Sequence, residues 1–166
     1  MSYESDLALR LTPYVAGEQP KNVKLIKLNT NENPYPPSPK VAEAIAGVPA
    51  DALRLYPDMD ATALCAAIAK VNGVDPACVF CGNGSDEVLA FAFAAFFAGK
   101  KLLAPDVTYS FYPVYADLFG VDYQTVPLTE KFEVDVAGLM QGCPVALANP
   151  NAPTGILLGS GEVRRL

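Results

Sequence analysis

The sequence contains no histidine among its 166 residues. This absence excludes Ser-His-Asp and Cys-His catalysis, and it removes the commonest metal ligand in proteins. Proton transfer by such a protein must therefore use a lysine, a tyrosine, a carboxylate or a cofactor.

Positive charge is also scarce, because 12 basic residues stand against 18 acidic ones and leave a net charge of -6. No basic run of any length appears, and Arg164-Arg165 is too short to form a patch. This balance argues against nucleic acid or an anionic membrane as the main partner. The longest apolar run, 88–99, is too short to span a bilayer, and the acidic start at 1–6 is unlike a signal peptide. We therefore expect a cytoplasmic protein.

Cysteine is limited to four residues. Cys78 and Cys81 have the spacing of a zinc-ligand pair, but they lie in an apolar run and no second ligand pair follows. Buried, reduced thiols are therefore the preferred interpretation, and we expect no metal.

The apolar residues, 51% of the chain, are distributed in a strand–helix alternation that begins near residue 78. We expect strands at 24–28, 78–81, 101–104, 122–126 and 144–148, and helices at 4–11, 39–47, 61–72, 85–97, 109–119 and 135–140. Strands that are apolar throughout and alternate with helices predict an α/β fold, in which helices cover both faces of a mostly parallel sheet.

Local signals set several helix boundaries. Ser38 precedes Pro39, a favoured first helical residue, and glycine ends several of the expected helices. Asp60 is expected to cap the third helix, and Gly73 to end it. The face of that helix expected to be buried carries Leu64, Ala67, Ile68 and Val71. The helical segment 88–97 is apolar nearly all round, which predicts that it is buried.

The most informative stretch is Gly82-Asn83-Gly84-Ser85-Asp86-Glu87, at a predicted corner between a strand and a helix. Glycines there leave backbone N–H groups uncovered, and the helix dipole adds partial positive charge, so the corner can bind an anion. Asp86 suits a helix N-terminus, and it could also pair with a cationic group of a ligand. A capped helix after a tight turn is an equally good interpretation.

The loops after consecutive parallel strands lie at one edge of a sheet, where ligands bind in α/β folds. The loops 82–86, 105–109 and 149–155 should therefore converge on one site. The loops 29–37 and 54–58 are either ligand contacts or stiff connectors.

Six motifs in the same order along the chain resemble those of the fold-type I aminotransferases, which use pyridoxal 5'-phosphate (PLP), and most closely those of the histidinol-phosphate aminotransferases. They are Leu11-Thr12-Pro13-Tyr14, Leu28-Asn29-Thr30-Asn31-Glu32-Asn33-Pro34, Arg54-Leu55-Tyr56-Pro57-Asp58, the stretch 82–87, Pro105-Asp106-Val107-Thr108-Tyr109-Ser110 and Asn149-Pro150-Asn151-Ala152-Pro153-Thr154-Gly155. The resemblance covers nearly the whole chain and implies part of a PLP-binding large domain.

The resemblance implies contacts with the cofactor for five residues of the loops 82–86, 105–109 and 149–155. Gly84, Ser85 and Asp86 would hold the phosphate through backbone N–H groups, and Tyr109 would stack on the pyridine ring unless it is merely a core tyrosine. Asn151 lies in the loop that binds the phenolic oxygen. Many relatives have asparagine at the position of Ala152, so either Asn151 replaces it or that hydrogen bond is missing.

Further implied roles concern the substrate and a second subunit. Tyr56 would reach the phosphate of a neighbouring subunit, which implies a homodimer with shared active sites. Tyr14 and Asn33 match positions near the substrate. Alternatively, Tyr14 packs beside Pro13 and Asn33 shapes a turn before Pro34.

The resemblance gives no catalytic residue within this chain. The Schiff-base lysine of the family and the carboxylate that pairs with the pyridine nitrogen both follow the Pro-Thr-Gly motif, and neither is present in these 166 residues. We therefore expect the chain alone to be inactive and to be the first part of a larger protein. The expected domains are an N-terminal arm with a small-domain segment at 1–50, and the N-terminal part of the large domain, incomplete, at 51–166.

Three functions remain open. The first is PLP-dependent transamination of histidinol phosphate with 2-oxoglutarate or glutamate, in histidine biosynthesis. The second, on the same scaffold, is an aromatic aminotransferase or a threonine-phosphate decarboxylase. The third is a non-catalytic fragment that binds a phosphorylated ligand.

Overall fold

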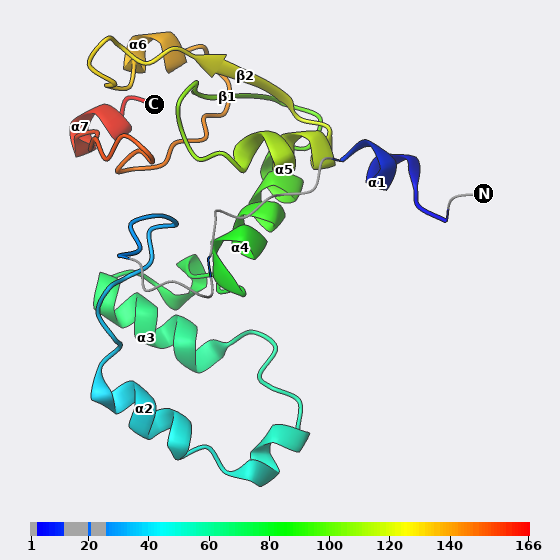
Figure 1. Cartoon of the computed structure of the whole chain (residues 1–166), viewed down its shortest axis with the longest axis vertical. Coiled ribbons are helices and arrows are strands. Elements are labelled where there is room, and N and C mark those ends of the chain that lie inside the picture. Colours follow the sequence, from blue (N-terminus) through cyan, green and yellow to red (C-terminus); the bar gives the residue numbers. More distant parts are fainter. Residues whose placement is uncertain (1–2, 12–19, 21–25) are drawn as a thin grey trace. The chain divides into compact units, whose positions relative to one another are not determined.

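The computed structural model describes residues 3–11, 20 and 26–166. The chain divides into two compact units, one made of Met1–Leu11 with Gly82–Leu166 and the other of Thr12–Cys81. Figure 1 shows the elements, and each unit is described by itself. The expected domain boundary at 50/51 concerns a complete aminotransferase and stays a prediction.

The unit Thr12–Cys81 is helical in its described part. Its elements are α2 (Pro39–Ala46), η1 (Ala50–Arg54), α3 (Thr62–Asn72) and η2 (Pro76–Cys78). Pro39 occupies the first turn of α2 and Gly47 follows its end, as expected. The strand expected at 24–28 falls partly outside the described residues, and 26–28 are irregular.

Two expectations for α3 are wrong. Asp58, and not Asp60, accepts the hydrogen bond from the Thr62 N–H, at 2.7 Å from Oδ2. The buried residues are Cys65 and Ala69, whereas Leu64 and Val71 are 53% and 85% exposed. α3 contacts η2, and the sulfur of Cys65 lies 3.7 Å from that of Cys81. Apolar spacing marks candidate faces but does not identify the packing partner.

The expected strand 78–81 is also wrong. Asp75 accepts the Ala77 N–H at 2.8 Å and begins the 3-10 turn η2, which includes Cys78. Residues 79–81 are irregular, because in the described chain no strand pairs with them. The four cysteines are free, as expected, but only Cys65 is buried.

The other unit contains the sheet. Its elements are α1 (Asp6–Arg10), α4 (Gly84–Ala92), the π-helical turn η3 (Phe93–Phe97), β1 (Lys101–Pro105), α5 (Tyr112–Phe119), β2 (Asp122–Val126), α6 (Val136–Leu139) and α7 (Ser160–Val163). β1 and β2 are parallel, with Lys101 opposite Asp122 and Pro105 opposite Val126. The expected strand 144–148 is reduced to one parallel bridge between Val145 and Leu103, so β1 is paired on both sides.

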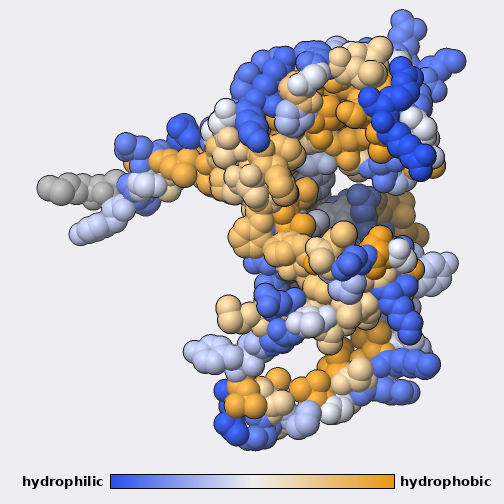
Figure 2. Space-filling model, turned by 180° about the vertical axis from the view of Figure 1, so that it is seen from behind, coloured by the Kyte–Doolittle hydropathy of each residue, from blue (hydrophilic) through white to orange (hydrophobic). Residues whose placement is uncertain are grey.

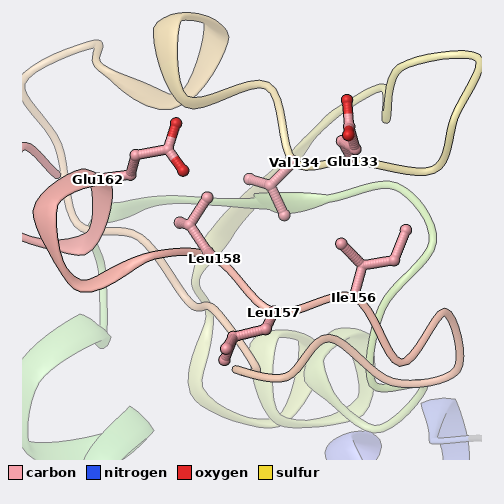
Figure 3. A pocket seen from close by; sticks show the side chains of 6 residues that line it. All are labelled: Glu133, Val134, Ile156, Leu157, Leu158 and Glu162. Atoms are coloured by element: carbon pink, nitrogen blue, oxygen red, sulfur yellow. The ribbon is translucent and has the colours of Figure 1, made fainter.

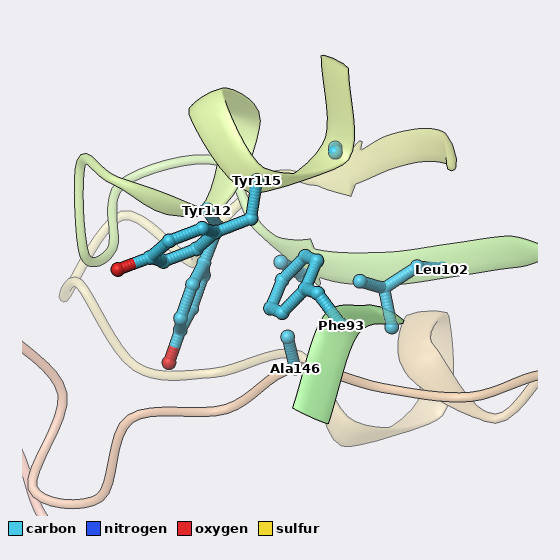
Figure 4. Packing of buried hydrophobic residues seen from close by; sticks show 7 residues of the cluster. Phe93, Leu102, Tyr112, Tyr115 and Ala146 are labelled. Atoms are coloured by element: carbon cyan, nitrogen blue, oxygen red, sulfur yellow. The ribbon is translucent and has the colours of Figure 1, made fainter. Parts of the chain in front are cut away.

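Helices cover both faces of β1. Leu102 and Ala104 point into a core with Phe93, Tyr112 and Tyr115, to which α5 and η3 contribute. Figure 4 shows Phe93 between Leu102 and the two tyrosines, and its ring centroid is 5.2 Å from that of Tyr115.

The opposite face of the sheet meets a second cluster. Leu103 packs there with Val126 and with Leu139 of α6. The alternation along β1 thus buries successive side chains on two faces, as the α/β pattern predicts. β2 departs from that pattern, because most of its side chains are exposed.

The expectation that the segment 88–97 is buried is wrong. Phe93 alone of that segment is buried, whereas Phe91 and Phe96 are 54% and 63% exposed. Apolar surface is visible on the molecule in Figure 2. Within the described residues, no helix combines the length and hydropathy needed to cross a membrane.

Candidate cofactor site

The predicted anion corner forms at the start of α4. Gly84 has a φ of +82°, a conformation that glycine adopts without strain. A side chain at Gly82 would meet Glu87 Oε2 at 2.9 Å and Val88 Cγ2 at 3.0 Å, so the loop requires glycine there too.

The N-terminus of α4 is left open for a ligand. Asn83, the N-cap residue, makes no side-chain capping hydrogen bond. The backbone N–H of Asn83 donates to Glu87 Oε2 at 2.6 Å, so the Glu87 side chain binds the residue that precedes the helix. Ser85 and Asp86 lie in the first turn, where N–H groups have no acceptor inside the helix. Together with the helix dipole, these groups are suited to receive an anion.

Asp86 links this corner to two tyrosines. Tyr109 donates its hydroxyl to Asp86 Oδ1 at 2.7 Å, and Tyr115 donates to the same oxygen at 3.2 Å and to the Asp86 carbonyl oxygen at 3.1 Å. Burial, followed by the Asp86 carboxylate, raises the pKa of Tyr115 far above its usual value, so its hydroxyl stays protonated. The Asp86 carboxylate therefore accepts hydrogen bonds from the protein.

Tyr109 presents a half-buried ring beside α4. The ring meets Tyr112 edge to face, with centroids 5.5 Å apart, and its hydroxyl is held by Asp86. A ring fixed at its hydroxyl end and partly exposed can stack on a flat heteroaromatic ligand.

Asn151 joins the two other loops. It is 1% exposed, its Oδ1 accepts the Thr108 hydroxyl at 2.8 Å, and its Nδ2 donates to the Val107 carbonyl at 2.9 Å. These two bonds favour one orientation of the amide, and within residues 3–11, 20 and 26–166 one of the two Nδ2 hydrogens has no acceptor.

Asn149 fixes the base of the same loop. Its side chain accepts the Leu158 N–H at 2.8 Å and donates to the Leu158 carbonyl at 3.1 Å, as a strand neighbour would. Inside the loop, Gly155 has a φ of +72° and donates its N–H to the Asn151 carbonyl oxygen. The loop 149–158 is therefore closed at its base.

The three loops expected to converge do so. The hydrogen bond from Tyr109 to Asp86 joins 105–109 to 82–86, and the two bonds of Asn151 join 105–109 to 149–155. The structure thus brings together Gly84, Ser85, Asp86, Tyr109 and Asn151.

The other three residues expected at the site do not belong to the unit that contains α4. Tyr14 lies outside the described residues. Asn33 and Tyr56 belong to the unit Thr12–Cys81. Asn33 accepts the Tyr35 N–H at 3.0 Å, the turn geometry expected as its alternative role, and the side chain of Tyr56 is fully exposed.

Sequence reasoning assigned no role to Tyr115 or Thr108. Tyr115 lies three residues after Tyr112, a spacing that places both on one face of α5, but the spacing does not reveal a hydrogen bond to α4. Thr108 belongs to a recognised motif, and its contact with Asn151 depends on how two distant loops pack.

A separate hollow of about 220 Å³ lies in the same unit. Figure 3 shows Val134 and Leu158 between the carboxylates of Glu133 and Glu162, with Ile156 and Leu157 completing the lining. Two carboxylates beside an apolar floor repel a phosphate. This hollow is therefore distinct from the anion corner.

A family model described as "Aminotransferase class I and II" matches residues 23–166. The chain belongs to this family of enzymes, whose members are generally PLP-dependent. This result and the structural neighbours below confirm the expected fold class, a partial fold-type I domain.

Individual relatives are more specific. Histidinol-phosphate aminotransferases of Acinetobacter baumannii (strain SDF) and Acetobacter pasteurianus are 56% and 57% identical over 100% and 98% of this chain. The chain covers 47% and 46% of these proteins, about half their length. A solved structure provisionally assigned as a histidinol-phosphate aminotransferase of Erwinia carotovora atroseptica SCRI1043 has a TM-score of 0.70 at 26% identity, over 81% of this chain and 41% of its own.

Proposed function

We propose that the protein transfers an amino group between histidinol phosphate and 2-oxoglutarate or glutamate, as a PLP-dependent enzyme of histidine biosynthesis. The observation that carries the proposal is the open N-terminus of α4 beside Tyr109, in a chain that matches histidinol-phosphate aminotransferases along its whole length. The reaction is proposed for the protein as its complete reading frame encodes it.

The residues present fit PLP. The open N–H groups of Ser85 and Asp86, after the glycine at 84, suit a phosphate dianion. The half-buried ring of Tyr109 offers a stacking surface for the pyridine. The free Nδ2 hydrogen of Asn151 is of the right type to donate to the phenolic oxygen. When bound, PLP supplies an electron-accepting ring that eases loss of a proton from a carbon beside an amine.

The described residues of the chain would bind the cofactor and orient its ring. The backbone of the first turn of α4 holds the phosphate, and Tyr109 covers one face of the ring and keeps water from it. The carboxylate of Asp86 orients Tyr109 through Oδ1, the oxygen to which both tyrosine hydroxyls donate. Asp86 thus binds the cofactor through its N–H.

The remaining roles concern the substrate and a partner subunit. We place Tyr14 and Asn33 near the substrate. We also propose a cytoplasmic homodimer in which Tyr56 reaches the phosphate of the neighbouring site, and its full exposure is compatible with that role. None of the lysines in these 166 residues is assigned as the imine-forming lysine of the family. None of the relatives named above carries the name of the alternative activities.

The test is an activity assay on the protein expressed from its complete reading frame, with its intact mass measured first. With PLP, histidinol phosphate and 2-oxoglutarate, we expect glutamate to form. Phenylalanine as amino donor and threonine phosphate as a source of carbon dioxide test the two alternative activities. Glutamate formation from phenylalanine but not from histidinol phosphate would reject the proposed substrate. Binding of PLP without any turnover would favour the non-catalytic alternative.

A further inference from the structure

Tyr115 of α5 has a buried ring and a hydroxyl group that contacts Asp86. Its side chain is 4% exposed, and its ring packs on Phe93 and Phe111 with centroids 5.2 Å and 5.1 Å away. Its hydroxyl reaches both the carbonyl oxygen and Oδ1 of Asp86. A ring held among aromatic neighbours has little freedom, so its hydroxyl is a fixed point.

Tyr109 is less constrained. It lies in the loop before α5 and is only half-buried, and its hydroxyl shares Oδ1 of Asp86 with Tyr115. A carboxylate only accepts, so both hydroxyls donate to it. Besides the edge-to-face contact between the rings of Tyr109 and Tyr112, this shared oxygen thus links Tyr109 to the ordered core.

We propose that Tyr115 is a positioning residue of the cofactor site: it fixes Asp86, and through Asp86 it orients the ring of Tyr109. The expected effect on PLP binding rests on the proposed function. The effect on the orientation of Tyr109 rests only on the hydrogen bonds to Asp86. Tyr115 also holds the Asp86 carbonyl in the first turn of α4, so it steadies the N–H groups that receive the phosphate.

A second effect is electrostatic. Two hydroxyl donors spread the negative charge of Asp86, which lies in the same helical turn as the phosphate donors. Removal of one donor leaves a more localised charge near a dianion and a less ordered Tyr109. Both changes weaken PLP binding.

The test compares Tyr115→Phe with Tyr112→Phe in the protein expressed from its complete reading frame. Both substitutions remove one hydroxyl from a buried ring on α5, but of these two hydroxyls only that of Tyr115 has a hydrogen bond to Asp86 among the contacts of the described chain. We expect Tyr115→Phe to weaken PLP affinity about 5- to 10-fold in calorimetry, and Tyr112→Phe to leave it within about twofold. In an Asp86→Ala background, Tyr115→Phe should change the affinity by less than about twofold, because the shared acceptor is gone.

A readout without cofactor separates this inference from the proposed function. With 3-fluorotyrosine incorporated, the fluorine resonance of Tyr109 is assigned by its loss in Tyr109→Phe. Tyr115→Phe should shift or broaden it, and Tyr112→Phe should do so much less. If the wild-type protein binds no PLP, the proposed function fails, and this resonance alone decides the inference. An unchanged Tyr109 resonance, or equal effects of Tyr115→Phe in both backgrounds, overturns it.

Discussion

At the scale of single residues, the role proposed for Ser85 belongs to its backbone N–H and not to its side chain. Its N–H lies in the open first turn of α4, beside that of Asp86. The proposed site therefore depends on a peptide group, which side-chain truncation leaves intact.

A proline tests this dependence, because proline lacks an N–H yet is tolerated in the first helical turn. We expect Ser85→Pro to weaken binding of PLP, and of inorganic phosphate, about tenfold or more in calorimetry. Ser85→Ala, which keeps the N–H, is the matched control and should bind nearly as the wild type does. A Ser85→Pro variant that is folded by circular dichroism and binds normally would exclude the backbone from the site.

Tyr115 also makes stability depend on alkaline pH. Its pKa is raised in the folded state by burial and by Asp86, and burial raises the pKa values of Tyr112 and Tyr123. The unfolded chain loses these protons near pH 10, where the folded chain still holds them. This contribution to stability is complete below about pH 10 and decreases as the pH rises further.

We expect the urea midpoint of the wild type to fall above about pH 10, and to fall less steeply in Tyr115→Phe. Tyr3 is fully exposed, so Tyr3→Phe is the control and should keep the wild-type slope. Equal slopes for all three proteins would contradict the assignment.

Asp58 stabilises the start of α3. Its carboxylate accepts the N–H groups of Thr62 and Asp60, and these hydrogen bonds, first of all those with Thr62, lower its pKa. We expect Asp58→Ala to reduce helicity and lower the thermal midpoint, whereas Asp60→Ala has little effect. The effect of Asp58→Ala should vanish in acid, as the pH falls through the lowered pKa and the wild type loses the same contact. A larger effect from Asp60→Ala would favour the original expectation.

At the scale of elements, Gly138 allows α6 to approach the sheet. A methyl group there would lie 2.7 Å from Val126 Cγ1 of β2 and 2.6 Å from Oδ2 of Asp135, the residue whose other oxygen, Oδ1, accepts the Gly138 N–H at the start of α6. We expect Gly138→Ala to reduce the free energy of unfolding by about 1–3 kcal/mol. Gly161 of α7 has open space around it, so Gly161→Ala should be neutral or slightly stabilising in the same urea titration.

The elements also show where sequence reasoning succeeds. Gly47, Gly73 and Gly120 follow helix ends as expected, because chain reversal after a helix is a local property. The strands near 101–105 and 122–126 were expected from their apolar content, and they form. The segments 78–81 and 144–148 do not form full strands, because a strand exists only where a neighbour pairs with it.

In the candidate site, too, local features could be predicted from the sequence, whereas contacts between distant segments could not. The glycine-rich start of α4 could be predicted from consecutive residues. The contacts of Tyr115 with Asp86 and of Thr108 with Asn151 could not, because each joins segments far apart in the sequence. The resemblance supplied roles for single residues, and the structure supplied the groups that hold them in place.

At the scale of the whole molecule, apolar side chains are exposed in each unit. Phe91 and Phe96 are exposed near the end of α4 and in η3, and Ile45 and Val71 are exposed in the helices of the other unit. Such surface favours association. We expect the 166-residue chain to self-associate in light scattering, with a measured mass that rises with concentration and with sulfate. A monodisperse monomer would contradict this expectation.

The central position of β1 has a consequence for synthesis on the ribosome. Leu103 pairs with Gln124 on one side and with Val145 on the other, and the Leu103 N–H donates to the Pro144 carbonyl. A nascent chain that has emerged only as far as β1 holds an apolar strand with both edges unpaired. It gains one neighbour when β2 leaves the exit tunnel and the second only when residues 144–146 follow. A translational pause before residue 144 would therefore prolong the state most open to chaperones and to aggregation.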